Sequence, residues 1–151
     1  MDLSLQDAQR VLAAGLAKAE SIGTAVSVAV VDARGDLVTL ARMEGAGYAA
    51  ADIARGKAQA AAMFGVPSQA YQEMATAPIM QRINELSGGT VVFFQGGAPI
   101  KRDGVVIGGV GASGFASQPE YDDETSQAGA DAIGPAAGSK MNSEKTVNDG
   151  G

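Results

Sequence analysis

Side chains able to hold a ligand or to transfer protons are concentrated in one stretch of the sequence. Arg42, Glu44, Tyr48, Asp52 and Lys57 follow one another within sixteen positions. An arginine can hold a carboxylate through two hydrogen bonds, and a lysine or carboxylate in an apolar pocket can act as an acid or a base because its pKa is shifted. We therefore take Glu44, Asp52 and Lys57 as candidate catalytic residues, and Arg42, Tyr48 and Lys57 as candidate ligand contacts.

A simpler interpretation applies to Asp52. It precedes Arg55 by three positions, the spacing at which opposite charges pair along the surface of a helix. We favour this ion pair on a solvated helix face over a catalytic role for Asp52.

The second candidate region is a glycine-rich run that includes GVGASG, residues 109–114. These letters fit the G-x-G-x-x-G of a dinucleotide-binding loop, which also needs a following helix and a second parallel strand. No hydrophobic strand remains after residue 114, so the sequence argues against a dinucleotide site. The other common phosphate-binding loop, GxxxxGK[ST], does not occur in the chain.

Glycines within a strand point instead to a close approach of something else to the backbone. A sheet surface without side chains can form a groove for a ligand, or it can form a seat for a helix or a neighbouring subunit. Both interpretations remain open. On the first of them, the candidate ligand contacts in this run are Gly96, Gly97, Gly111 and Ser113.

Composition excludes several kinds of chemistry. The 151 residues include neither Cys nor His, which removes disulfides, thiolate metal sites, Cys nucleophiles and the Ser-His-Asp triad. The net charge of −6 argues against nucleic acid or an anionic membrane surface as a partner. The four acidic residues within 120–124 suit the first turn of a helix, and because they lack the spacing of a calcium loop we predict no metal site.

These residues must be positioned by elements that the hydrophobic pattern predicts. Short turns between successive strands make those strands antiparallel, so the pattern indicates an α+β domain with one antiparallel sheet. The expected helices cover 5–21, 49–65, 69–75, 78–86 and 118–133, and the expected strands cover 25–32, 37–44 and 90–96 with two further arms around the turn at Arg102–Gly104.

We expect one domain over residues 1–137 and a polar, disordered tail over 138–151. The first residues, MDLSLQDAQR, lack the basic start and apolar run of a signal peptide. No apolar run approaches the roughly 18 residues of a membrane span. We therefore expect a cytoplasmic protein.

Three stretches resemble a known family: GDLVTLARMEGA at 35–46, DIARGKAQAAAMFGVPS at 52–68 and QGGAPIKRDGVVIGGVGASG at 95–114. They are similar to the GlcG/HbpS-like family, also described as haem-degrading or PduO C-terminal-like, and the likeness extends over about residues 3–134. The resemblance implies a profilin-like fold with a five-stranded antiparallel sheet and flanking helices. It also implies assembly into homodimers, tetramers or octamers.

The same resemblance implies a small-molecule ligand, with haem or a corrinoid as candidate cofactors. Members that bind haem are expected to use a histidine, so axial ligation here would fall to Met, Tyr or Lys. Three functions follow as hypotheses. The first is a small-ligand-binding protein, the second is a catabolic enzyme of the lyase, hydratase or isomerase type, and the third is an accessory oligomeric subunit.

Overall fold

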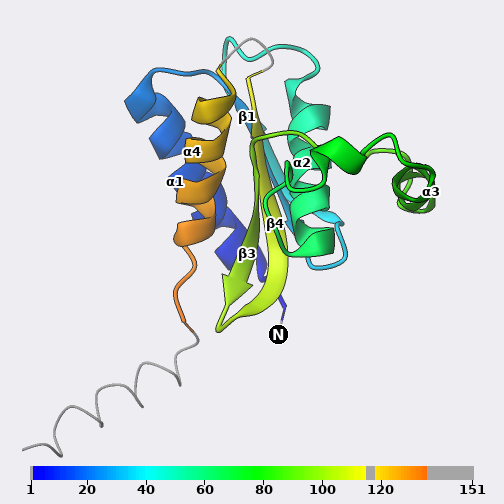
Figure 1. Ribbon diagram of the computed structural model, residues 1–151. Helices are drawn as coiled ribbons and strands as arrows, with labels where there is room; N and C mark the ends of the chain where they lie inside the picture. Colours follow the sequence, from blue (N-terminus) through cyan, green and yellow to red (C-terminus); the bar gives the residue numbers. More distant parts are fainter. Residues whose placement is uncertain (1, 115–117, 136–151) are drawn as a thin grey trace, which may run out of the picture.

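A computed structural model describes residues 2–114 and 118–135, which form three layers (Figure 1). A sheet lies in the middle, with α1 and α4 on one face and α2 on the other. The elements in chain order are α1 (Leu5–Ile22), β1 (Ser27–Asp32), β2 (Leu37–Arg42), α2 (Ala50–Phe64), the 3₁₀ turn η1 (Gln72–Met74), α3 (Pro78–Leu86), β3 (Gly97–Arg102), β4 (Val105–Ser113) and α4 (Pro119–Asp131). The α+β class expected from the sequence is confirmed.

The sheet is antiparallel throughout and has the strand order β2-β1-β4-β3. Two hairpins, β1–β2 and β3–β4, meet where β1 pairs with β4. Ser27 lies opposite Ser113 and Asp32 lies opposite Gly108 in that central pairing. Val28, Val30 and Val110 are fully buried at the centre of the sheet, consistent with the nearly continuous apolar sequence of β1.

The expectation of five strands is wrong for the described residues, which form four. Residues 90–96 form no strand; they run along α2, and the Gly96 carbonyl reaches β4, at the Ala112 amide. The amide of Val92 donates to the Gly56 carbonyl at 3.1 Å, and a Cβ at Gly56 would overlap the Thr90 carbonyl oxygen. Val91 is buried and Val92 and Phe93 are partly buried in this segment, whereas Phe94 is 43% exposed. The local apolar pattern cannot distinguish burial against a helix from burial within a sheet.

Glycines 109 and 111 seat α2 on the sheet. A Cβ at Gly109 would overlap the Ala58 carbonyl oxygen, and a Cβ at Gly111 would overlap the Ala54 carbonyl oxygen. The helix presents alanines to this surface, so its backbone lies directly on β4. At these two positions the structure supports the seat for a helix that the sequence left open.

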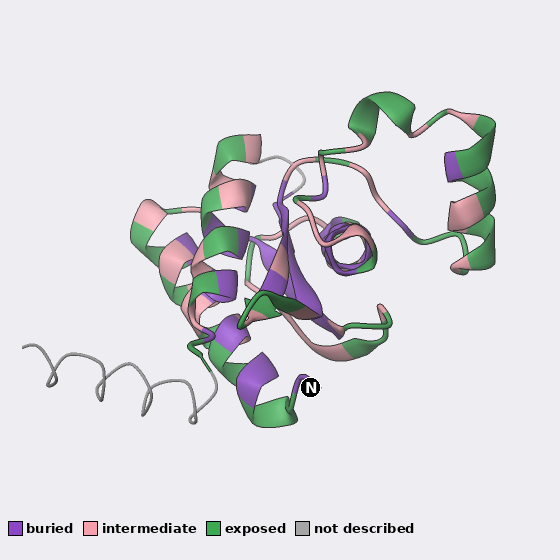
Figure 2. Ribbon diagram, turned by 60° about the horizontal axis from the view of Figure 1, so that its bottom comes forward, coloured by how far each residue is buried: buried purple, intermediate pink, exposed green. Residues whose placement is uncertain are grey.

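The opposite face holds the main hydrophobic core, between the sheet and the pair α1 and α4 (Figure 2). Helix α1 begins with a reciprocal capping box: the Asp7 amide donates to Ser4 Oγ at 3.0 Å, and the Ser4 amide donates to Asp7 Oδ2 at 3.3 Å. Asp7 also receives two hydrogen bonds from the guanidinium of Arg102, at 3.1 and 3.3 Å. This ion pair ties the start of α1 to the end of β3.

Helix α3 projects from the three layers in both views (Figures 1 and 2). The short helix expected over 69–75 is only the 3₁₀ turn η1, whereas the helix expected over 78–86 forms with the same bounds. Within the described part of the chain, no helix has the length and apolar character needed to cross a membrane. The tail expected over 138–151 lies outside the described residues.

Candidate functional site

Lys57 is a residue of α2 whose charged side chain is buried between this helix and the sheet. It is 1% exposed, although it stands among the alanines with which α2 contacts the sheet. Its Nζ donates to the Ala112 carbonyl at 2.9 Å and to Asp122 Oδ2 at 3.2 Å. A buried ammonium needs such partners because leaving water is strongly unfavourable for a charge.

Asp122 is 4% exposed and comes from the first turn of α4. The pair therefore joins the two helices that lie on opposite faces of the sheet, and it does so near the end of β4, where Lys57 also bonds to Ala112. Burial lowers the pKa of Lys57, while the carboxylates of Asp122 and Asp123 oppose this effect. The lowered pKa brings the amine closer to the range in which it can lose its proton.

Gly96 makes room for this ion pair. Its φ of +120° is a conformation that favours glycine, and a Cβ there would lie 2.8 Å from both Lys57 Nζ and Asp122 Cβ. The Gly96 carbonyl accepts a hydrogen bond from the Ala112 amide at 2.8 Å, which holds the two backbones together. Gly96 thus allows the lysine to reach the end of β4.

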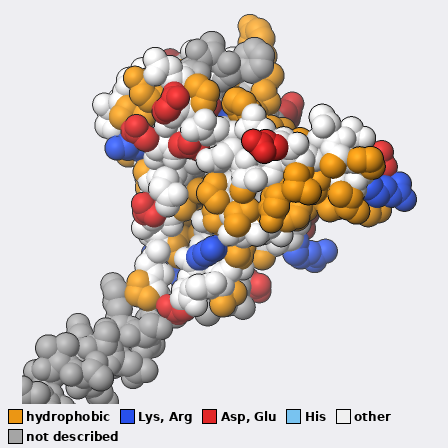
Figure 3. Space-filling model, viewed as in Figure 1, with side chains coloured by type: hydrophobic (Ala, Val, Ile, Leu, Met, Phe, Trp, Pro, Cys, Tyr) orange, Lys and Arg blue, Asp and Glu red, His pale blue; other side chains and the backbone are white. Residues whose placement is uncertain are grey.

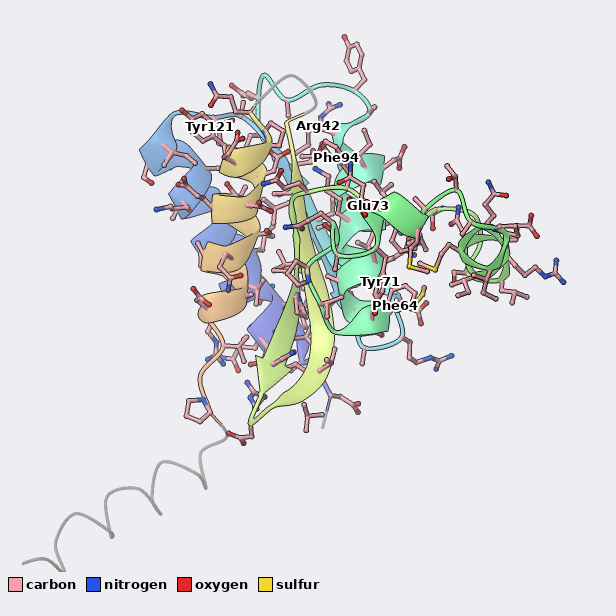
Figure 4. The ribbon with its side chains drawn as sticks, viewed as in Figure 1. Arg42, Phe64, Tyr71, Glu73, Phe94 and Tyr121 are labelled. Atoms are coloured by element: carbon pink, nitrogen blue, oxygen red, sulfur yellow. The ribbon has the colours of Figure 1, made fainter. Side chains whose placement is uncertain are left out.

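A cavity of about 360 Å³ opens beside the ion pair. Lys57 and Asp122 supply its charged wall, and the Phe94 ring centroid lies 5.6 Å from Lys57 Nζ. Figure 4 shows Phe94 beside α2. The complete lining is Ile53, Lys57, Val92, Phe94, Ser113, Pro119 and Asp122. The site therefore combines mostly apolar walls with one acid–base pair and one hydroxyl group.

A larger hollow of about 540 Å³ lies along α4, where Lys18, Asp123 and Glu124 are among its lining residues. Its charged groups are partly exposed, and Lys18 Nζ lies 4.0 Å from Glu124 Oε2. We prefer the smaller cavity as the candidate site because its ionisable groups are desolvated, which is the condition under which they become reactive.

The residues chosen from the glycine-rich run occupy different places. Ser113 lines the cavity, and Gly96 lies directly behind the ion pair. Gly111 lies beneath α2, away from any open surface, since a Cβ there would overlap helix backbone. Gly97 packs against Lys57 backbone and Ser68, and its amide donates to Ser68 Oγ at 2.8 Å.

The residues chosen from 42–52 are not brought to Lys57. Arg42, Glu44 and Tyr48 line a separate hollow of about 390 Å³, and Tyr48 is 94% exposed. Arg42 lies at the end of β2, where Figure 4 labels it. Asp52 is exposed on α2, and the ion pairs of the described residues do not include Asp52 with Arg55.

Sequence reasoning missed Asp122 as a site residue because its place near a helix start was explained by capping alone. The neighbouring Asp123 does face elsewhere, since Gln95 Nε2 donates to its carboxylate. An acidic residue in the first turn of the helix that follows the glycine-rich strand was the available signal. Among residues 2–114 and 118–135, no group of three or more acidic side chains is arranged to hold a metal ion.

Comparison with known proteins agrees with this architecture. Residues 3–131 match the family described as haem degrading protein HbpS-like. The chain belongs to the HbpS-like family. One HbpS-like relative, protein GlcG of Escherichia coli K12, is 34% identical over 119 residues, which cover 74% of this chain and 81% of GlcG.

Another relative is the corrinoid adenosyltransferase PduO of Citrobacter freundii. It is 28% identical over 123 residues, which cover 81% of this chain and 37% of PduO. This HbpS-like chain therefore corresponds to about a third of that protein's length.

Solved structures show the same fold. A double mutant of HbpS from Streptomyces reticuli superposes with a TM-score of 0.77 at 32% identity, covering 89% of this chain and 88% of HbpS. A PduOC:Heme complex superposes with a TM-score of 0.75 at 28% identity, covering 88% of this HbpS-like chain and 96% of PduOC.

Proposed function

We propose that this HbpS-like chain binds a small organic ligand in the cavity bounded by Lys57 and Asp122. The observation that carries the proposal is a desolvated acid–base pair on the wall of an otherwise apolar cavity. Ligand sites typically consist of apolar walls with a few placed polar groups that fix orientation. The ion pair and the Ser113 hydroxyl supply those groups here.

The cavity volume indicates a small ligand. At about 360 Å³ it lies near the lower end of the roughly 300–1,000 Å³ range of ligand pockets. Apolar contacts from Ile53, Val92 and Phe94 favour a short hydrocarbon part, and Lys57 favours an oxygen acceptor next to it. A ligand with a carbonyl, carboxylate or hydroxyl group on a few carbon atoms has this pattern.

Haem is the ligand named for the related PduOC complex, but the lining of this cavity does not fit haem ligation. The sequence has no His, and neither Met nor Tyr is among the lining residues. Lys57 is the one lining residue with a side-chain nitrogen, and that nitrogen donates to Ala112 and Asp122. As long as Lys57 is an ammonium held by these two partners it offers iron no lone pair, so we propose no iron ligand in the cavity.

The direct test fills the cavity with a larger side chain at a position of α2. Ile53 is partly exposed and lines the cavity, so Ile53→Trp should fill it. Met63→Trp, a 39% exposed position on the same helix that does not line the cavity, is the matched control. We expect native mass spectrometry of protein purified from cells to show a small bound molecule in the wild type and in Met63→Trp, but not in Ile53→Trp. Equal retention in all three would refute a site in this cavity.

Titration with haemin and with cobalamin, followed by absorbance, tests the tetrapyrrole alternatives. We expect the spectra of haemin and cobalamin to respond in the same way to the wild type and to Ile53→Trp. A shift in the haemin spectrum that is abolished by Ile53→Trp, and preserved by Met63→Trp, would show that the cavity does hold haem. A shift common to both variants would place a tetrapyrrole at another surface.

Acid–base catalysis on the bound ligand is the second candidate function, and the Lys57–Asp122 pair favours it. Of the catalytic candidates taken from the sequence, Lys57 has the buried setting that such a role needs, whereas Glu44 and Asp52 are exposed. Once the ligand is identified, Lys57→Ala should abolish turnover while Glu44→Ala should not.

Self-association through α3 is the third part of the proposal. Ile79 is 60% exposed and Leu86 is 74% exposed on this projecting helix. Figure 3 shows hydrophobic side chains gathered along the projecting part. A second copy of the chain is the occupant we propose for this surface, in keeping with the homo-oligomer that the family resemblance implies.

A further inference from the structure

We infer that the ligand of the cavity is a small aldehyde or ketone, and that Lys57 captures it as an imine. This inference rests on the proposed function, since it requires that small molecules enter the cavity. It assigns a chemical class to the ligand and a covalent role to Lys57. The geometry that carries it is an amine on the wall of an apolar cavity with a carboxylate in hydrogen-bond contact.

One N–H group of the Lys57 ammonium is not used by its two hydrogen-bond partners. An ammonium carries three N–H groups, and the contacts of Lys57 Nζ use two of them, toward Ala112 and Asp122. Lys57 also lines the cavity, and its Nζ lies 5.6 Å from the ring centroid of Phe94, another lining residue. Its remaining N–H, or its lone pair after deprotonation, is therefore available to a molecule in the cavity.

Asp122 can take the proton that Lys57 must lose before its amine can attack a carbonyl group. Asp122 Oδ2 lies 3.2 Å from Nζ and can accept a proton directly from it. The surrounding Ile53, Val92, Phe94 and Pro119 side chains provide little solvation for separated charges. A desolvated lysine whose pKa is lowered is the usual form of an imine-forming lysine.

The reaction balances with the groups present. Lys57 transfers a proton to Asp122, and the free Nζ lone pair attacks the carbonyl carbon to form a C–N bond. The carbonyl oxygen receives the proton held by Asp122, and the nitrogen returns one proton to the same carboxylate. Loss of the hydroxyl group as water, with that proton, leaves a protonated imine paired with the Asp122 carboxylate. One water is released and the net charge is unchanged.

A merely structural ion pair would explain the burial of Lys57 equally well, so the test must detect the covalent step. Wild-type protein is incubated with propanal, or separately with pyruvate, in the presence of sodium cyanoborohydride, which reduces an imine to a stable secondary amine. Peptide mass spectrometry then measures the fraction labelled at Lys57 and at the exposed Lys101. Propan-1-ol, which has no carbonyl group, is the control compound.

We expect at least about tenfold more label on Lys57 than on Lys101 with one of the carbonyl probes, because the cavity holds the probe next to the Lys57 amine. Label at Lys57 should fall in Ile53→Trp and persist in Met63→Trp. Label on Lys101 alone, or equal label on Lys57 in both variants, would overturn the inference.

The controls separate this inference from the proposed function. If Ile53→Trp still abolishes retention of the native small molecule while Lys57 is never labelled, the cavity binds a ligand but the imine is wrong. Lys57→Arg keeps a positive charge beside Asp122 and cannot form an imine. It should lose this label and keep a cooperative unfolding transition, whereas a total label on Lys57→Arg equal to that of the wild type would overturn the assignment.

Discussion

Lys57 Nζ and Asp122 Oδ2 lie 3.2 Å apart in the interior, although the two residues are 65 positions apart in the chain. The contact links α2 on one face of the sheet to α4 on the other, around the end of β4. Both side chains are almost completely buried, at 1% and 6% exposure. Each charge is therefore acceptable to the fold only while the other is present.

Asp122→Asn should lower the free energy of unfolding by about 3 kcal/mol at pH 7, because it leaves the Lys57 ammonium buried without its carboxylate. Burial already lowers the pKa of Lys57 below 10.5, and loss of Asp122 lowers it further; Asp123 opposes the effect only in part. The unfolded state then holds a proton that the folded state has lost, so stability rises with pH in the variant.

The difference in the free energy of unfolding between wild type and Asp122→Asn should therefore become smaller between pH 7 and pH 10, as measured by urea unfolding. Glu120→Gln, an exposed position in the first turn of the same helix, controls for the interaction with the helix dipole. A deficit that stays constant over this pH range would contradict the assignment of Lys57 as the titrating group.

Gly111→Ala should lower the free energy of unfolding by about 3 kcal/mol, since the new methyl group overlaps the Ala54 carbonyl oxygen and must push α2 from β4. Gly134→Ala is the control because a Cβ there meets nothing within 4 Å, and it should change stability by less than about 0.5 kcal/mol. Chemical denaturation measures both. Equal stability of the two variants would show that the helix seat adjusts without strain.

Asp7→Asn should destabilise the protein by about 2 kcal/mol at neutral pH by weakening the charged hydrogen bonds from Arg102. The Arg102 hydrogen bonds hold the pKa of Asp7 below its usual 3.8. A carboxyl group with a lowered pKa in the folded state stabilises the protein above pH 3.8, and this stabilisation is lost as the pH falls through the folded-state value.

The difference between wild type and Asp7→Asn should therefore vanish in strong acid, as followed by thermal unfolding from pH 2 to pH 7. Asp2→Asn, at an exposed position near the same end of the chain, should have little effect at any pH. A difference that persists unchanged at pH 2 would mean that the carboxylate charge of Asp7 is not responsible.

Leu86→Glu should reduce the molar mass measured by sedimentation equilibrium, because it places a charge on the apolar surface of α3 that we assign to a second copy. Gln81→Glu adds the same charge at an exposed polar position of α3 and should leave the mass unchanged. If both variants keep the wild-type mass, self-association does not use this side of α3.

Several features of this protein follow from local sequence. Apolar β-branched residues produce β1, the Ser4–Asp7 capping box begins α1, and Pro78 opens α3. The hairpin turns and the glycine-rich strand β4 could be predicted for the same reason. These elements form because their determining interactions lie within a few residues of one another.

Lys57 itself was predictable as a candidate, but its partners were not. The sequence suggested Arg42, Glu44 and Asp52 because they are neighbours along the chain, and all three are exposed away from the buried amine. The segment 90–96 reads as a strand for a similar reason, since its apolar pattern records burial without identifying what buries it.

Tertiary structure decided the site. Pairing of β4 with β1 brings the Ala112 carbonyl to the end of the sheet, and α4 then returns Asp122 to the same point. Local sequence contains the side chains and their intrinsic preferences. A buried charge, however, is stabilised by the groups that the packed layers bring within about 3 Å of it. Those groups belong to segments that are far apart in the sequence.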